Sequence, residues 1–171
     1  MKKIIVYFFI FMMIFSSCAK NYKTVTSDND TVTAVPGDDT AMNSIIKNAR
    51  NTVNDFVLHF KNPEKGEHSF TVKYPFATDP GSESTVEHIW LNEIKIKDGR
   101  YFGKIANDPL DIKKYKYGDE VQFDIHKITD WMYIKNHKII GGRSIKFLIE
   151  SIPENERTDD QKSMLEMFQE S

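Results

Sequence analysis

The sequence predicts an α+β domain, in which an antiparallel sheet of about five or six strands packs against helices. Three features predict this fold class. An early segment repeats apolar residues at helical spacing, the middle of the chain alternates apolar and polar residues, and the last segment returns to helical spacing. The chain has 171 residues, 40% of them hydrophobic and 28% charged, so its length and composition suit one globular domain.

The first predicted element is an amphipathic helix that runs from about Thr40 to Asn62-Pro63. Asp39 or Thr40 can cap its start, and the proline ends it. The same stripe would suit a helix that binds a partner, but we expect it to pack on the chain's own sheet. The apolar stripe consists of Met42, Ile45, Ile46, Ala49, Val53, Phe56, Val57 and Phe60.

The first predicted strand contains Phe70, Val72 and Tyr74, which alternate with polar residues. Because Pro75 follows and cannot donate a backbone hydrogen bond, we expect an edge strand.

The next element is a hairpin whose two-residue turn is Asp98-Gly99, because this dipeptide suits positive φ at both central positions. The expected register pairs Ile96 with Tyr101, Ile94 with Gly103 and Glu93 with Lys104. The side chains expected to face the core are Trp90, Ile94, Ile96, Tyr101 and Ile105.

The last third of the chain predicts a strand over residues 120–126, and then a hairpin that joins residues 131–134 to 138–141 around Asn136-His137. Gly141-Gly142 allows a sharp reversal. Two short helices follow, with Ser144 and Thr158 as their expected caps.

The amino terminus predicts an export signal. Lys2 and Lys3 precede twelve apolar residues, Ile4 to Phe15. At about 1.5 Å per residue this helix spans roughly 18 Å, which is short of a bilayer core of about 30 Å. The small residues Ser16 and Ser17 then precede Cys18. This stretch resembles the bacterial lipoprotein box, which implies cleavage before Cys18, a thioether lipid on its sulfur and an acyl group on its new amine. A free thiol after an ordinary secretory signal, or an uncleaved anchor, is the alternative.

These observations divide the chain into a signal at residues 1–17, a lipidated flexible tether at 18–40 and one domain at 41–171. The tether is rich in Thr, Asp, Asn and Ser. Removal of the signal would take away Lys2 and Lys3 and leave 21 basic and 25 acidic residues, a formal charge of about −4. This charge argues against a nucleic-acid partner. A single cysteine excludes an internal disulfide and a cysteine-cluster zinc site.

Residues 87–157 resemble a bacterial family of unknown function, the YegJ-like proteins. Several short segments in a fixed order carry the resemblance. They are Glu87-His88-Ile89-Trp90, residues 98–105, Asn107-Asp108-Pro109, Tyr117-Gly118-Asp119, Asp130-Trp131-Met132-Tyr133 and residues 141–145. At Asn136-His137 the chain departs from the glycine often found in that family, which would suit a wider turn. The family has no established activity, so the resemblance implies a compact domain and no catalytic residue.

The candidate chemistry is limited to one weak acid/histidine group, formed by His88, Asp119, His126 and Asp130 together with Glu87. Ordinary structural roles in turns and bends explain these residues equally well. The five histidines show no metal-ligand spacing, so we expect no metal and no cofactor.

A second candidate is an interaction surface that contains Trp131, Tyr133 and Arg143, although large side chains of this kind more often belong to the core.

The sequence therefore predicts an exported, lipid-anchored protein of the cell membrane or outer membrane. Its domain is expected to bind an envelope protein or polymer without catalysis. An envelope hydrolase that uses the acid/histidine group is the alternative, and the oligomeric state stays open.

Overall fold

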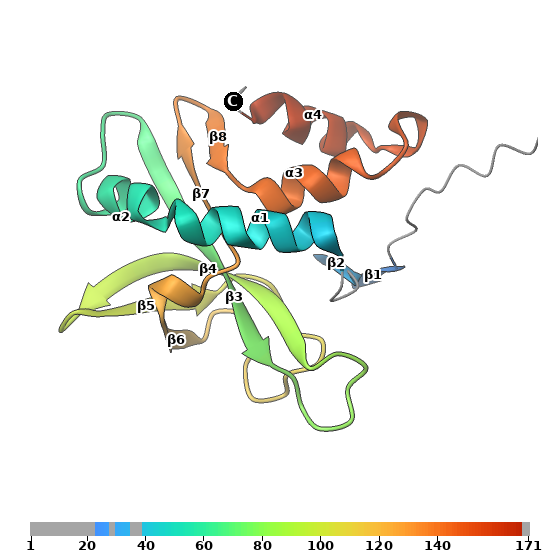
Figure 1. Cartoon of the computed structure of the whole chain (residues 1–171), viewed down its shortest axis with the longest axis horizontal. Helices are drawn as coiled ribbons and strands as arrows, with labels where there is room; N and C mark the ends of the chain where they lie inside the picture. Colours follow the sequence, from blue (N-terminus) through green and yellow to red (C-terminus); the bar gives the residue numbers. More distant parts are fainter. Residues whose placement is uncertain (1–22, 28–29, 35–38, 169–171) are drawn as a thin grey trace, which may run out of the picture.

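The computed structural model describes residues 23–27, 30–34 and 39–168, and it has the predicted α+β fold (Figure 1). The main sheet has six strands in the order β6-β5-β4-β3-β7-β8, with antiparallel neighbours throughout. The strands are β3 (Glu67–Ala77), β4 (Val86–Lys97), β5 (Arg100–Ile105), β6 (Glu120–Phe123), β7 (Asp130–Lys135) and β8 (Lys138–Gly141). The helices are α1 (Thr40–Asn51), α2 (Val53–Lys61), α3 (Arg143–Glu150) and α4 (Asp159–Met167), with 3₁₀ turns η1 (Ile125–Lys127) and η2 (Glu154–Glu156).

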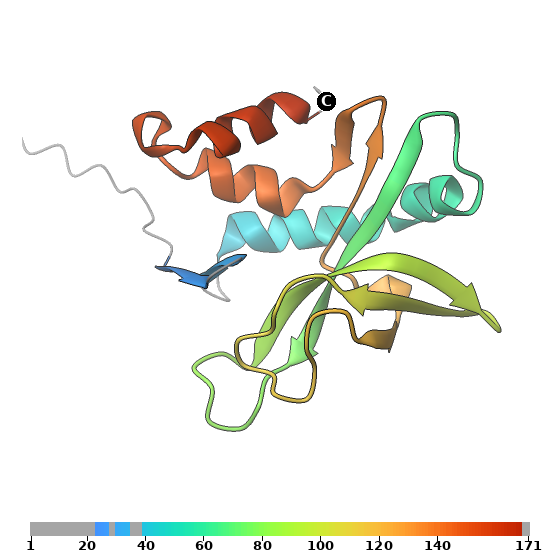
Figure 2. The same cartoon turned by 180° about the vertical axis from the view of Figure 1, so that it is seen from behind.

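Helices α1 and α2 lie in front of β3 and β7 in Figure 1. In Figure 2, which shows the molecule from the other side, the strands lie in front of the helices. The two layers meet at Phe56 of α2 and Trp131 of β7, whose ring centroids lie 5.7 Å apart. Both side chains are buried. Among the described residues, none of the helices is long and apolar enough to cross a bilayer.

The predicted first helix is present but divided in two at Thr52. Asp39 caps its start as expected, because Asp39 Oδ1 accepts a hydrogen bond from the Met42 amide at 2.9 Å. The break has a tertiary cause: the indole Nε1 of Trp131 donates to the Ala49 carbonyl and to Thr52 Oγ1, each at 3.2 Å. A side chain that inserts into the helical hydrogen-bond ladder bends the helix at that point.

Strand β3 is central rather than an edge strand, because it pairs with β4 on one side and β7 on the other. The prediction from Pro75 was wrong for a local reason. The pairing with β7 ends at Lys73, so that β4 is the strand beside Pro75. The missing N–H therefore costs the sheet little at this position.

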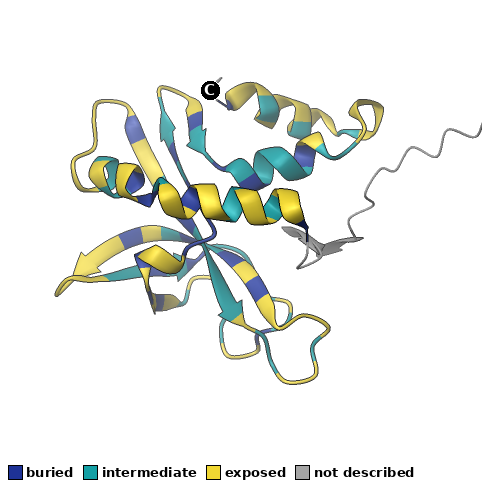
Figure 3. Cartoon of the chain, viewed as in Figure 1, coloured by how far each residue is buried: buried dark blue, intermediate teal, exposed yellow. Residues whose placement is uncertain are grey.

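The hairpin at Asp98-Gly99 is confirmed, and Ile96 pairs with Tyr101 as expected. The register then shifts between Asn92 and Lys95, where Glu93 adopts a φ of 44°. Because this β-bulge adds a residue to β4, the side chains before it lie on the opposite face of the sheet from the one that an unbroken register predicts. Figure 3 shows the alternation of burial along β4.

The bulge corrects the predicted core face of this hairpin. Ile94 and Ile105 are buried as expected. Before the bulge, however, Leu91 is the fully buried residue that faces the core. Its neighbour Trp90 is half-buried on the opposite face. Lys104 consequently has Asn92, not Glu93, as its Cα partner.

The second hairpin is also present, and Asn136 and His137 both adopt positive φ. Lys135 pairs with Lys138, so the turn has two residues and is not wider. The predicted strand after residue 120 ends at Phe123, because Asp124 Oδ1 accepts the His126 amide and starts η1.

Of the two late helices, α4 has the expected cap: Thr158 and Gln161 form a reciprocal capping box. In α3, by contrast, Ser144 lies inside the helix and Gly142 precedes it.

The segment that we expected to be a flexible tether contains a two-stranded hairpin, β1 (Lys23–Ser27) and β2 (Asp30–Ala34), in which Lys23 pairs with Ala34. Cys18 and the apolar stretch Ile4 to Phe15 lie outside the described residues.

Candidate functional site

Two of the four acid/histidine candidates, His88 and Asp130, lie near Lys73 of β3. Asp130 is fully buried. Its carboxylate accepts hydrogen bonds from the Trp131 amide at 2.8 Å and from the Ser144 amide at 2.7 Å. Because Ser144 is in the first turn of α3, Asp130 supplies the helix cap that we expected from Ser144 itself. Burial raises the pKa of Asp130, while these hydrogen bonds and the charge of Lys73 oppose the rise.

His88 lies near the same lysine, and its Nδ1 is 2.9 Å from Thr129 Oγ1. Desolvation of the ring, together with the charges of Lys73 and Arg50, lowers the pKa of His88 to about 4. A histidine with such a pKa is neutral at pH 7 and is a weak base, because efficient acid/base catalysis needs a pKa near the working pH.

The other candidates lie elsewhere and have structural partners. Asp119 Oδ2 accepts the Lys116 amide in a turn at 3.0 Å. His126 is exposed in η1. Glu87 accepts the amides of Leu110 and Asp111 at 2.9 and 3.0 Å, and so fastens a loop to β4. The structure therefore brings His88 and Asp130 to one lysine and places the remaining candidates at separate sites.

The predicted interaction surface is mostly core. Trp131 and Tyr133 are each 4% exposed, because both side chains face α1 and α2. Arg143 covers Trp131, with the guanidinium carbon 4.8 Å from the ring centroid. These two aromatic residues are thus packing residues, and Arg143 is half-buried.

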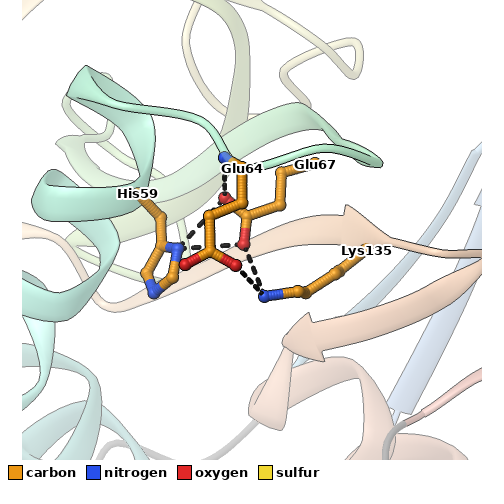
Figure 4. A network of polar contacts seen from close by, with 4 residues as sticks. All are labelled: His59, Glu64, Glu67 and Lys135. Atoms are coloured by element: carbon orange, nitrogen blue, oxygen red, sulfur yellow. Dashed lines mark hydrogen bonds and ion pairs between the residues drawn. The ribbon is translucent and has the colours of Figure 1, made fainter.

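Three potential metal ligands meet where α2 ends and β3 begins. The donor atoms of His59, Glu64 and Glu67 lie within 4.8 Å of one another. Lys135 of β7 approaches the same carboxylates, with Nζ 2.7 Å from Glu64 Oε2 and 3.0 Å from Glu67 Oε1 (Figure 4). His59 Nδ1 lies 2.9 Å from Glu67 Oε1. The lysine ammonium thus already compensates the two carboxylates in the way that a bound cation would.

The pKa values support a structural role for this cluster. Burial alone would raise the pKa of Glu67, but hydrogen bonds from the Glu64 amide, Lys135 and His59 lower it below its usual range. The hydrogen bonds to the two glutamates raise the pKa of Lys135. Both groups therefore stay charged at neutral pH and join α2, β3 and β7.

The strand register defines a different candidate, which we call the outer face: the face of the sheet opposite to α1 and α2. Cross-strand pairs place Lys73 beside Trp90, Lys95 beside Phe102, and Lys104 beside Glu120 on this face. Trp90 and Phe102 are half-buried rather than covered. The outer face consists of Thr71, Lys73, Pro75, His88, Trp90, Asn92, Lys95, Lys97, Arg100, Phe102, Lys104, Glu120, Gln122 and Met132, together with the buried Asp130.

Lysines lie over both aromatic rings of the outer face. Lys73 Nζ is 5.6 Å from the Trp90 ring centroid, and Lys97 Nζ is 5.2 Å from that of Phe102. Lys97 also forms a 2.8 Å ion pair with Glu120 across β5. Sequence reasoning missed this face, although the alternating Glu93-Ile94-Lys95-Ile96-Lys97 of β4 was a visible signal for a basic strand surface. The arrangement can bind an anionic surface by charge and by its aromatic rings.

The fold and the outer face define an α+β domain in which α1 and α2 cover one side of an antiparallel sheet. Comparison with known proteins then gives the family. Residues 39–166 match the family described as "Uncharacterized protein conserved in bacteria (DUF2314)", and the chain belongs to it. The match is longer than the resemblance at residues 87–157, and it includes α1, α2, α3 and all of α4 except Met167.

Two curated relatives are similar to this chain. One is the "Uncharacterized protein YegJ" of Escherichia coli (strain K12), which is 34% identical over 128 residues and aligns with 75% of this chain and 80% of that protein. The other is a protein of Neisseria meningitidis serogroup B named for ankyrin repeats, which is 33% identical over 89 residues, or 52% of this chain and 35% of that protein. No solved structure matches the chain.

Proposed function

We propose that this protein is an exported envelope lipoprotein, attached at Cys18 to the cell membrane or outer membrane, whose domain binds another envelope component without catalysis. The outer face carries the binding role in this proposal, because it combines two half-buried aromatic rings with five basic side chains on one sheet surface. Aromatic and basic residues are characteristic of recognition surfaces. The lipid anchor rests on the small residues and the single cysteine that follow the apolar segment.

The alternative, an envelope hydrolase, needs His88, Asp119, His126 and Asp130 in one cleft. Their hydrogen-bond partners lie in different parts of the structure, as described above. This separation favours the binding role over the hydrolase.

Site-specific photo-crosslinking in native envelopes tests the binding role. A photoreactive phenylalanine in place of Phe102 keeps an aromatic ring on the outer face, and the same group in place of Met164 of α4 is the matched control, because Met164 is 39% exposed and lies on another element. We expect a specific product from position 102 that exceeds the product from position 164 at least several-fold. Equal products from both positions would contradict a binding role for the outer face.

A further inference from the structure

The outer face is basic although the mature chain as a whole is acidic. Five basic side chains share it. Glu93 and Glu120 are the exposed carboxylates that pair with three of them, whereas Lys73 is largely buried beside Asp130. Lys104 Nζ lies 2.7 Å from Glu93 Oε2, and Lys95 and Lys97 both reach Glu120. The basic side chains are Lys73, Lys95, Lys97, Arg100 and Lys104.

The end of the molecule that contains α4 is acidic. In Figure 1, α4 lies at the top, and β5 and β6 lie in the lower half. Residues 150–166 carry six acidic side chains against two basic ones, Arg157 and Lys162. The acidic side chains are Glu150, Glu154, Glu156, Asp159, Asp160 and Glu166. Such a charge separation orients a molecule in the field of a charged surface.

The tether is shorter than its residue count implies. Because Lys23 pairs with Ala34, the ends of the β1–β2 hairpin lie side by side, and these residues add about 5 Å, the spacing of neighbouring strands. The two stretches from Cys18 to Lys23 and from Ala34 to Asp39 can span at most about 35 Å when fully extended. With the proposed anchor at Cys18, Asp39 stays within about 40 Å of the membrane surface. Because the lipid holds the domain this close to the membrane, the local concentration of the outer face at the membrane is high. Even a weak affinity of this face for the membrane is then enough for docking.

We infer that the outer face docks on the anionic lipid headgroups of the membrane to which Cys18 is attached, with α4 directed away from it. The inference rests on the proposed lipid anchor. Lysine-rich surfaces are attracted to anionic headgroups, and tryptophan rings favour the boundary between headgroups and hydrocarbon. Four of the five basic residues are lysines, which act as point charges and suit a diffuse charged surface. An acidic protein partner is the competing occupant, and the experiment distinguishes the two.

The test uses the lipidated mature protein in vesicles that contain headgroup-spin-labelled phosphatidylcholine, which quenches tryptophan fluorescence at the membrane surface. The chain has two tryptophans, and Trp131 is 4% exposed, so quenching reports on Trp90. We expect quenching when phosphatidylglycerol forms half of the lipid, little quenching in phosphatidylcholine alone, and loss of the quenched component in a Trp90→Phe variant. High salt should reverse the quenching, because it screens exposed charges.

The decisive variant neutralises Lys95, Lys97 and Lys104 by substitution with Gln. Each lysine near an anionic surface contributes about fivefold, so the ratio of docked to undocked protein should fall by about 100-fold. The matched control substitutes Gln for Lys138, Lys146 and Lys162 and should keep wild-type quenching. Phosphatidylglycerol-dependent quenching that survives in the first variant would overturn the inference.

A third arm addresses the competing occupant. Tighter binding of soluble polyglutamate than of phosphatidylglycerol vesicles to the outer face would overturn membrane docking in favour of an acidic protein partner. Failure of the protein to enter vesicles because it carries no lipid would instead count against the proposed anchor, so the two failures are distinguishable.

Discussion

Replacement of Asp130 by Ala is expected to lower the free energy of unfolding by about 3–5 kcal/mol, the range for removal of one partner from a buried charged network. Asp130 is fully buried and holds the first turn of α3 against β7 through the amides of Ser144 and Trp131. Without the carboxylate, both amides lose their acceptor, and Lys73 loses the negative charge that offsets its burial. Urea unfolding at pH 7 measures the change.

The control for this substitution is Asp119→Ala. Asp119 accepts one backbone amide in a turn that is partly open to solvent, so its loss should cost about 1 kcal/mol. Equal destabilisation by the two substitutions would show that Asp130 does not have the structural role described here.

The second large effect is expected from Trp131→Ala, at about 3–5 kcal/mol. The indole fills the space between β7 and α2 beside Phe56, underlies Arg143 and holds the Ala49 carbonyl at the break between α1 and α2. Removal leaves a cavity and frees a buried acceptor. Thermal unfolding followed by circular dichroism measures the loss.

Trp90→Ala is the matched control, because it removes the same side chain from the other face of the sheet. Trp90 is half-buried, so we expect a loss of about 1–2 kcal/mol, well below that for Trp131. The result would contradict the assigned faces if Trp90→Ala were the more destabilising of the two.

The fold was largely predictable because local signals specify most of its elements. Asp98-Gly99 determines a turn without help from distant residues, and the Thr158 capping box lies within four residues. The stripe on α1 and α2 likewise depends on spacing alone.

The missed features depend on contacts between distant residues or on a backbone conformation that has no sequence signature. The break at Thr52 arises from Trp131, which is 79 residues away in sequence. The bulge at Glu93 needs a positive φ in a residue that rarely adopts it, so the sequence predicted the wrong face for Trp90. The β1–β2 hairpin was missed because its polar composition outweighed the alternation of Thr and Val.

In the candidate site, too, residue types could be read from the sequence, but their arrangement depends on contacts between distant residues. The four acid/histidine residues were chosen by residue type, and only the sheet register could show that they do not gather in one place. The outer face likewise depends on the register, because Lys73, Trp90 and Phe102 become neighbours through β3, β4 and β5. In the cluster of His59, Glu64, Glu67 and Lys135, His59 and Glu67 are 8 residues apart in sequence, but Lys135 lies 71 residues from Glu64 and reaches them only through the pairing of β3 with β7.

The central claim, a lipid-anchored envelope protein, is tested most directly by intact-mass measurement of the protein purified from membranes of its native host. We expect a chain that begins at Cys18 and carries the added mass of a diacylglyceryl group and an amine-linked acyl chain. A chain that retains residues 1–17 and has an unmodified thiol would contradict it.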